Sequence, residues 1–322
     1  MHRVRLNGMT TDINIHQSQQ AIRHRAETNN PRAYQTGAEP FAASCPLPVY
    51  RAPNAVMVLS ASGGLGASTF AALLARTLHD SRDCALVDAD ISGGCLDILL
   101  GMESELGVLL NAVTAPLGEV DGVALRRRLT TWDGVGILSS RPWIAPIPQD
   151  WEIAVTVCAL ADMYDTVVVD AGRAGYTPGQ ALPLPIKGAA IILLVELSVL
   201  GTARAHACIE ALTGRGSRRS PDDQVTRVSR SAEGTVCEDD IALVGVLPPA
   251  VRATDRGVVG AQEAAEYLGI DMVCSIRPDT RLCAAALEGA GALKPNRANA
   301  KALRAMVSWL DARAQGMAHD QR

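Results

Sequence analysis

A glycine-rich turn between an apolar strand and an amphipathic helix constrains the fold of this chain more than any other feature. Residues 55–60 are a continuous apolar run of strand length, residues 62–69 read Ser-Gly-Gly-Leu-Gly-Ala-Ser-Thr, and residues 69–78 repeat apolar side chains at helical spacing. A strand, a glycine turn and a helix in this order form an arrangement in which backbone N–H groups face an anion. The alternative is a glycine-rich turn without a ligand in some other doubly wound protein.

The turn has the residues of a phosphate-binding loop except for its cation. Ala67 stands where such loops carry a lysine, which would place a positive charge between the terminal phosphates. The backbone amides and the helix dipole do not depend on that lysine, and Ser68 offers a hydroxyl group to Mg²⁺. We therefore expect weakened nucleotide binding and a larger loss of hydrolysis, because the missing contact acts most strongly on transition-state charge.

Two further apolar strands end in aspartates. Residues 84–90 are a short strand that ends in Asp88 and Asp90, and residues 166–172 are a second strand that contains Asp170. Because ligands bind at the carboxyl ends of parallel strands, we expect these three acids to converge on the glycine turn. An acid there can hold Mg²⁺ or orient an attacking water. Each aspartate alone is equally consistent with a cap on the following helix.

Together, residues 62–69, 87–90 and 169–170 resemble the ParA/MinD family of deviant-Walker ATPases. More narrowly, they resemble its actinobacterial CpaE-like branch, which includes the septum site-determining (Ssd) proteins. The resemblance extends over most of residues 55–315 and implies an α/β fold in which helices flank a doubly wound, mostly parallel sheet. Later segments that resemble the family's closing helix, strand and loop beside the nucleotide base are residues 256–269, 275–279 and 284–289.

The resemblance implies a role for each matching position. Ser68 and Asp170 would hold Mg²⁺. Asp90 and Asp170 would be the catalytic acids of the two switch segments, with Asp90 orienting the attacking water. ATP or ADP would lie against two loops, whose residues are Gly63, Gly64, Leu65, Gly66, Ala67, Ser68, Thr69, Arg277 and Pro278.

Two positions depart from the family pattern. Ser62 replaces the signature lysine and Ala67 replaces the loop lysine. In the family the signature lysine reaches across a nucleotide-sandwich dimer, so its absence weakens the expectation of an ATP-driven homodimer as well as that of hydrolysis. Degenerate loops of this kind are frequent in the CpaE-like branch. The resemblance therefore implies nucleotide binding with little or no turnover.

Three functional classes are consistent with these residues. The first is a weak or inactive ATPase that positions protein partners, either a Tad-type pilus or secretion apparatus or the division septum. The second is a scaffold of the same fold that binds no nucleotide, which the residues Ser62 and Ala67 favour. The third is an active ATPase, kinase or ligase that takes its cation from another position, for which the candidates are Arg76, Arg173 and Arg277.

The composition of the chain limits the kinds of partner and the cellular compartment that we expect. The formal net charge of the 322-residue chain is −4, so no overall basic field attracts nucleic acid or anionic lipid. Residues 188–197, the longest apolar run, are too short to cross a bilayer, which leaves at most peripheral membrane contact through partners. Eight cysteines without a Cys-x-x-Cys pair indicate a reducing cytoplasm rather than a disulfide framework or a zinc site.

The sequence divides into a tail, one domain and a shorter tail. Residues 1–52 are polar and proline-rich toward their end, which predicts a disordered tail and linker. Residues 53–315 alternate predicted strands and helices, as in a parallel sheet with right-handed crossovers. Within them, residues 214–240 are a polar insert without apolar periodicity, which we interpret as a mobile surface loop. Residues 316–322 are expected to form a disordered C-terminal tail.

Residues 299–314 predict an amphipathic helix. Its apolar face carries Leu303, Met306, Val307 and Leu310, while its polar face has too few cations for strong attraction to anionic lipid. We therefore expect this helix to pack against the domain rather than to bind a membrane. Further strands are expected at residues 134–138, 189–195 and 241–246, and further helices at residues 120–129, 151–163 and 202–212.

Overall fold

The structure is a computed structural model, and the residues that it describes lie within Pro48–Arg322. Most of the expected N-terminal tail, residues 1–49, lies outside the described residues, and so does most of the expected insert, residues 216–235. The residues that the structure describes are 50–105, 107–174, 184–215, 236–248, 256–289, 291 and 294–320.

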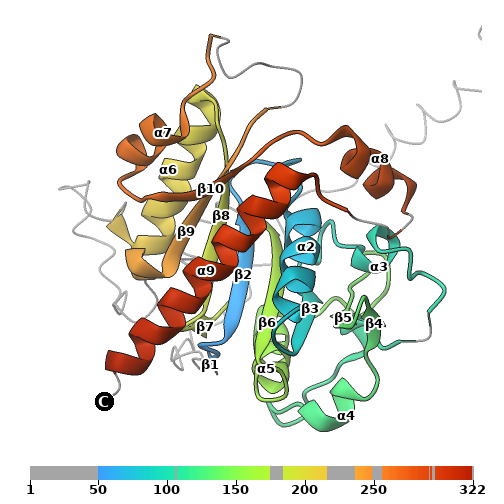
Figure 1. The fold of residues 1–322 in the computed structure, drawn as a ribbon. Coiled ribbons are helices and arrows are strands. Elements are labelled where there is room, and N and C mark those ends of the chain that lie inside the picture. Colours follow the sequence, from blue (N-terminus) through green and yellow to red (C-terminus); the bar gives the residue numbers. More distant parts are fainter. Residues whose placement is uncertain are drawn as a thin grey trace, which may run out of the picture. The chain divides into compact units, whose positions relative to one another are not determined.

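A mostly parallel sheet forms the centre of this part of the chain (Figure 1). Among the described residues its strand order is β10-β9-β8-β2-β6-β3-β5-β4, and every neighbouring pair is parallel except β4 with β5. The pair β1 and β7 forms a separate two-stranded sheet. The predicted fold class is therefore confirmed. The strands are β1 Tyr50–Arg51, β2 Ala55–Ser60, β3 Cys84–Asp88, β4 Thr130–Trp132, β5 Val135–Leu138, β6 Thr166–Arg173, β7 Ile186–Lys187, β8 Ala190–Glu196, β9 Ile241–Val246 and β10 Met272–Ile276.

The antiparallel edge strand β4 is absent from the elements that the sequence predicts. It is joined to β5 by the two residues Asp133 and Gly134, whose φ angles are 45° and 89°. Two consecutive positive φ angles are typical of the type I′ turn, which fits the twist of a hairpin, and Asp-Gly is one of its preferred sequences. The signal for this hairpin was thus present in the chain.

Helices cover both faces of the sheet. α2 and α9 lie on one face and α5 and α6 on the other, and Figure 1 shows α9 crossing the sheet beside α2. The helices are α2 Ala67–His79, α3 Leu96–Leu99, α4 Gly122–Arg126, α5 Asp150–Ala161, α6 Val199–Thr213, α7 Ala261–Leu268, α8 Thr280–Glu288 and α9 Arg297–Asp320, with single 3₁₀ turns at Leu110–Ala112 and Glu238–Asp240.

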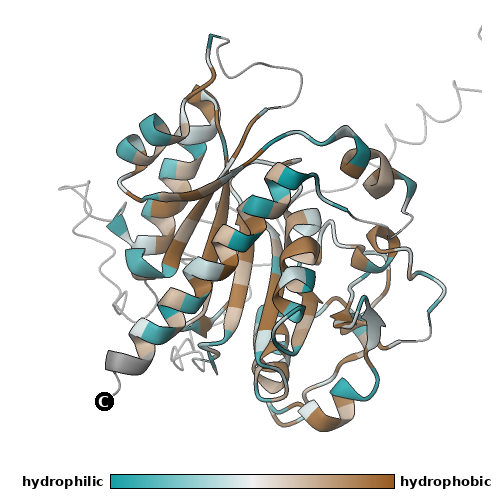
Figure 2. Cartoon of the chain, in the orientation of Figure 1, coloured by the Kyte–Doolittle hydropathy of each residue, from teal (hydrophilic) through white to brown (hydrophobic). Residues whose placement is uncertain are grey.

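The strand β2 shows how the sheet supports two hydrophobic clusters. All six of its residues are buried. Successive side chains of a strand point to opposite faces, so Val56 and Val58 pack with α2 and α9, while Met57 and Leu59 pack with α5 and α6. Figure 2 shows the central strands as mainly hydrophobic between helices of mixed colour. A strand that is apolar along its whole length is typical of a parallel sheet covered on both faces.

Several helix ends differ from their predicted positions. α6 begins at Val199, ahead of the predicted residue 202, because Ser198 caps it: the Ser198 Oγ accepts a hydrogen bond from Gly201 N over 3.0 Å. α4 has only five residues. α9 has 24 residues and ends at Asp320, so residues 316–320 continue the helix where the sequence suggested a tail.

The helix α9 packs against the domain, as its apolar pattern predicts. Leu303, Met306 and Leu310 are buried in the cluster that includes α2, and α9 also contacts β10. Arg313 adds an ion pair with Asp240 at 2.7 Å. No described helix combines the length and the apolar composition that crossing a membrane requires.

Candidate functional site

The glycine turn leaves β2 in the middle of the sheet and enters α2. Gly64 has a φ of 78° and Gly66 a φ of 79°, both in the left-handed region. A Cβ atom at either position would meet nothing within 4 Å, so glycine is needed there for its backbone conformation rather than for space. Gly63, Gly64 and Gly66 are all exposed. The backbone at the N-terminus of α2 is therefore open to an anionic ligand.

The two positions that could hold lysines in this turn are both buried and uncharged. Ser62 is 1% exposed and Ala67 is 8% exposed, and the Ala67 methyl group packs in the cluster between α2 and the sheet. Leu65 and Thr69 are half-buried, and Leu65 packs against the same cluster. The turn thus provides backbone donors and hydroxyl groups but no cation of its own.

Two arginines from other elements reach the first residues of the turn. Arg204 of α6 donates a hydrogen bond from Nη1 to Ser62 Oγ over 3.4 Å. Arg173, the last residue of β6, has its Cδ atom 4.0 Å from the place that a Cβ at Gly63 would occupy. Arg173 is one of the cations that the sequence suggested. Arg204 was not, because it lies 142 residues from Ser62 and belongs to no motif.

The other two suggested cations lie in other parts of the fold. Arg76 lies near the far end of α2, where it pairs with Asp133 at 3.4 Å and its guanidinium carbon lies 5.7 Å from the ring centroid of Trp132. Arg277 follows β10, which is three strands away from β2 in the sheet, and Pro278 follows it. The Arg277 backbone N donates to Asn299 Oδ1 over 3.0 Å. This fixes the segment after β10 at the carboxyl edge of the sheet.

Asp88 and Asp170 form a buried carboxylate pair beside the turn. They are direct partners in the pairing of β3 with β6, and they are 0% and 1% exposed. Asp88 Oδ2 accepts hydrogen bonds from the backbone N atoms of Leu96 and Ser140 over 3.1 and 3.3 Å. Asp170 Oδ1 accepts one from the backbone N of Gly172 over 3.1 Å, and the nearby Ser68 hydroxyl lowers the pKa of Asp170. The predicted pair of metal ligands, Ser68 and Asp170, is therefore close enough for the Ser68 hydroxyl to influence the Asp170 carboxylate.

The pair retains unused hydrogen-bonding capacity. Asp88 Oδ1 and Asp170 Oδ2 are buried and have no hydrogen-bond partner among the described residues. Burial raises the pKa of Asp88 to about 7, and the neighbouring charge of Asp170 adds to this shift. Burial also raises the pKa of Asp170, against the hydrogen bonds from Ser68 and Gly172 that lower it. Buried carboxylate oxygens without partners, beside a hydroxyl group, fit a hard divalent cation such as Mg²⁺.

Asp90 lies in the turn after β3. Its Oδ1 accepts hydrogen bonds from the backbone N and the Oγ of Ser92 over 3.2 and 2.7 Å, and from Gly93 N over 2.9 Å. A Cβ atom at Gly172 would lie 2.5 Å from Asp90 Oδ2, so the Asp90 carboxylate approaches the backbone just after Asp170. The structure therefore brings together the two acids that the sequence named as catalytic. Asp88, to which the sequence assigned no individual role, is the third member of this group.

Comparisons with known proteins agree with this geometry. Residues 51–125 match a family model described as ParA: NUBPL iron-transfer P-loop NTPase. A ParA family ATPase from Chlorobium tepidum superposes with a TM-score of 0.54 at 17% identity, over 80% of this chain and 99% of that chain. The septum site-determining protein MinD complexed with Mg-ADP, from Pyrococcus horikoshii, superposes with a TM-score of 0.50 at 17% identity, over 78% and 93%.

A curated relative extends the similarity to sequence. The uncharacterized protein Rv3660c of Mycobacterium tuberculosis is 26% identical over 264 residues, which are 81% of this chain and 65% of that protein. The chain thus spans less than two thirds of the length of this relative. The sheet order, the glycine turn and the neighbouring acids define a P-loop NTPase fold of the ParA/MinD type.

Proposed function

We propose that this chain is a ParA/MinD-family protein of the CpaE-like, Ssd-containing branch that binds ATP or ADP weakly together with Mg²⁺. Its nucleotide-binding domain would be residues 53–315, and it would act in the cytoplasm. One observation carries this proposal: the open glycine turn leads into Ser68, whose hydroxyl influences the buried Asp170 carboxylate, while Ser62 and Ala67 leave the turn without a lysine.

In this proposal the residues present fit a nucleotide and its metal. The backbone N–H groups of the exposed turn and the N-terminus of α2 hold phosphate oxygens. The Ser68 hydroxyl and the carboxylates of Asp88 and Asp170 would hold Mg²⁺, which would neutralise phosphate charge. Asp90 is held by three hydrogen bonds at the edge of the same group, in a position to orient water.

The missing lysines limit turnover more than binding. A hydrogen bond between charged groups contributes about 1.5–3 kcal/mol, so losing one weakens binding by roughly tenfold or more. A lysine would also stabilise the negative charge that develops on the phosphoryl group in the transition state. Its absence therefore slows hydrolysis in addition to weakening binding. We therefore infer a pseudo-ATPase or a very slow ATPase that uses its nucleotide-binding site to position protein partners.

The cellular role follows from the proposed family. Two systems fit it, a Tad-type pilus or secretion apparatus and the division septum, and a homodimer of the chain fits both. The MinD protein with a similar fold is named as septum site-determining, which favours the septum as the first system to test. Fluorescently labelled chain in dividing cells distinguishes the two: enrichment at the septum supports the division role, and enrichment at the pilus base supports the secretion role.

A nucleotide-free scaffold is the second candidate function, and the buried, uncharged Ser62 and Ala67 favour it. Equilibrium binding of ATP and ADP to the full chain, with and without Mg²⁺, separates the two candidates. We expect Mg²⁺-dependent binding that Asp170→Asn weakens and that Asp271→Asn, an exposed control before β10, leaves unchanged. If millimolar nucleotide does not bind, the scaffold replaces our proposal. Phosphate release above that of Asp170→Asn would instead assign the protein a genuine ATPase activity.

A further inference from the structure

An arginine that no sequence motif predicts lies against the glycine turn. The Arg204 guanidinium donates from Nη1 to the hydroxyl of Ser62, the first residue of the turn, over 3.4 Å. Ser62 is 1% exposed and Arg204 is half-buried. The contact therefore places a permanent positive charge at the start of a turn that has none of its own.

The fold explains why Arg204 is placed there. β8 is the direct neighbour of β2 in the sheet, and α6 begins only a few residues after β8 ends. The start of α6 is held close to the strand, because a Cβ atom at Gly201 would lie 2.3 Å from the carbonyl oxygen of Glu196. Ser198 caps the helix in the same turn. As a result, the second turn of α6, which contains Arg204, faces the glycine turn that follows β2.

A second arginine approaches from the other side of β2. β6 is the other direct neighbour of β2, and its last residue is Arg173. Arg173 is exposed, and its side chain passes Gly63, with Cδ 4.0 Å from the position of a Cβ there. The strand that leads into the turn is thus flanked by two elements that each bring an arginine to the first two residues of the turn.

We propose that Arg204, assisted by Arg173, binds the phosphates of a nucleotide in place of the two missing lysines. This inference rests on the proposed nucleotide binding. Guanidinium groups present several N–H donors in a planar fork and bind phosphate oxygens through paired hydrogen bonds. A phosphate oxygen carries charge, so it is a stronger acceptor for the Nη1 donor than the neutral hydroxyl of Ser62, which lies 3.4 Å away. Both arginines come from the same chain as the turn.

The arrangement also predicts which part of the ligand is recognised. The carboxyl groups of Asp88, Asp90 and Asp170 lie together on the other side of the site, where a bound cation would offset their negative charge. Arg204 and Arg173 would supply fixed positive charge on the side of Ser62 and Gly63. A ligand that meets both sides needs a chain of phosphates with a divalent cation. The ligand class is therefore a nucleoside di- or triphosphate with Mg²⁺ rather than a nucleoside or a monophosphate.

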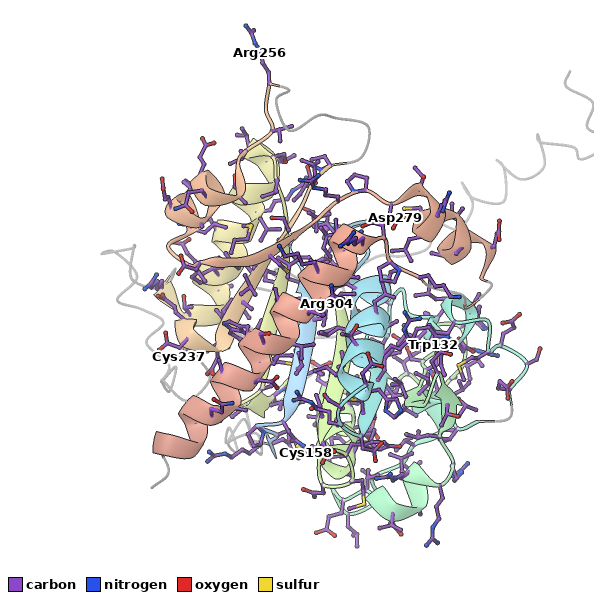
Figure 3. All side chains as sticks on the ribbon, in the orientation of Figure 1. Trp132, Cys158, Cys237, Arg256, Asp279 and Arg304 are labelled. Carbon is purple, nitrogen blue, oxygen red and sulfur yellow. The ribbon has the colours of Figure 1, made fainter. Side chains whose placement is uncertain are left out.

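The test compares nucleotide affinity between the full-length chain and charge variants. Isothermal titration with ATP and Mg²⁺ would be performed on wild type, Arg204→Ala, Arg204→Gln, Arg204→Lys and Arg173→Ala. Arg304→Ala is the matched control, because Arg304 is an exposed arginine of α9 (Figure 3). We expect Arg204→Ala and Arg204→Gln to weaken ATP binding about tenfold, Arg204→Lys to weaken it less, and the control to bind like wild type. Loss of Arg204 should also reduce the salt dependence of the affinity.

The outcomes separate this inference from the proposed function. If wild type binds ATP and the affinity of Arg204→Gln is within twofold of the wild-type affinity, the proposed role of Arg204 is overturned and the proposed function stands. Wild type that binds no nucleotide at millimolar concentration overturns the proposed function and this inference together. Arg204→Gln keeps most of the length of the side chain, and thermal unfolding would be measured for every variant. Weak binding by a variant with wild-type stability therefore reports the lost charge.

Discussion

Asp88 and Asp170 are direct partners in the parallel pairing of β3 with β6, which brings two buried carboxyl groups together at the carboxyl edge of the sheet. Burial raises the pKa of both groups, and each keeps one oxygen without a hydrogen-bond partner among the described residues. Folding therefore works against the charged form of this pair. A cation bound at the site would offset that cost.

The first prediction concerns the pH dependence of stability. The pKa of Asp88 is raised from 3.8 to about 7, so its stabilising contribution is fully present below about pH 4 and is lost as the pH rises through 7. Asp88→Asn removes this titration. Without added Mg²⁺, wild type should lose stability from pH 5 to pH 8 through the ionisation of Asp88, and the variant should not. The unfolding free energy of the variant minus that of wild type should therefore be about 1–3 kcal/mol larger at pH 8 than at pH 5. Urea unfolding at both pH values measures the difference.

The control for this prediction is Asp271→Asn, which changes an exposed aspartate before β10. It should shift the stability of the protein by a similar amount at both pH values. If Asp88→Asn changes stability equally at pH 5 and pH 8, Asp88 is already ionised in the folded chain and the assignment is wrong.

The second prediction concerns repair of the turn. Ala67→Lys should tighten ATP binding about tenfold, because it restores a charged donor to the phosphates. Ala67→Met is the matched control, since it adds a long side chain to the same buried position without charge. Titration with ATP and Mg²⁺ measures both variants. Unchanged affinity in a stably folded Ala67→Lys chain would show that the turn does not present its backbone to phosphates.

The third prediction concerns hydrolysis by a doubly repaired chain. Adding Ser62→Lys to Ala67→Lys should raise the rate of phosphate release above that of wild type, provided that Asp90 and Asp170 act as the resemblance implies. Introducing Asp170→Asn into the same background should return the rate to the baseline. A rate that does not depend on Asp170 would indicate a contaminating activity and would contradict the assignment.

The fourth prediction concerns metal removal. EDTA should weaken ATP binding by wild type severalfold or more and should have little effect on Asp170→Asn, because that variant has already lost a carboxylate of the proposed metal site. Titrations in Mg²⁺ and in EDTA measure the two effects. If EDTA weakens ATP binding equally in the two proteins, Asp170 is not a metal ligand.

The fifth prediction concerns the packing of α9. Met306 is 0% exposed in the cluster between α9 and α2, so Met306→Ala should lower the free energy of unfolding by about 2–4 kcal/mol. Arg304→Ala, on the exposed side of the same helix, should change it by less than about 0.5 kcal/mol. Similar losses in the two variants would mean that α9 is not packed as described.

Local patterns were sufficient to predict the elements that carry the site. The apolar run of β2, the glycines and the helical spacing of α2 are each encoded within a few residues. Convergence of Asp90 and Asp170 followed from strand topology, because the carboxyl ends of parallel strands share one edge. The helix ends were less accurate, since tertiary packing and caps such as Ser198 decide where a helix begins.

The environment of single side chains, unlike the convergence of strand ends, could not be predicted. Arg204 meets Ser62 only because β8 and β2 are neighbours and α6 starts close to the strand, and neither segment alone carries that information. The shifted pKa of Asp88 likewise depends on its burial and on hydrogen bonds from Leu96 and Ser140, which lie on later segments. Patterns along the chain identify candidate groups, whereas the environment of each group is a property of the whole fold.

The packing of α9 on α2 has a consequence for biosynthesis. Leu303 and Met306 complete the apolar surface around the helix that begins at the glycine turn. A ribosome releases α2 long before it releases residues 297–320, so a nascent chain carries the turn and its helix with one side uncovered. Contacts between segments so far apart form late and slowly. The nascent chain would therefore expose apolar surface beside its future binding site, where a chaperone could bind, until α9 has been made.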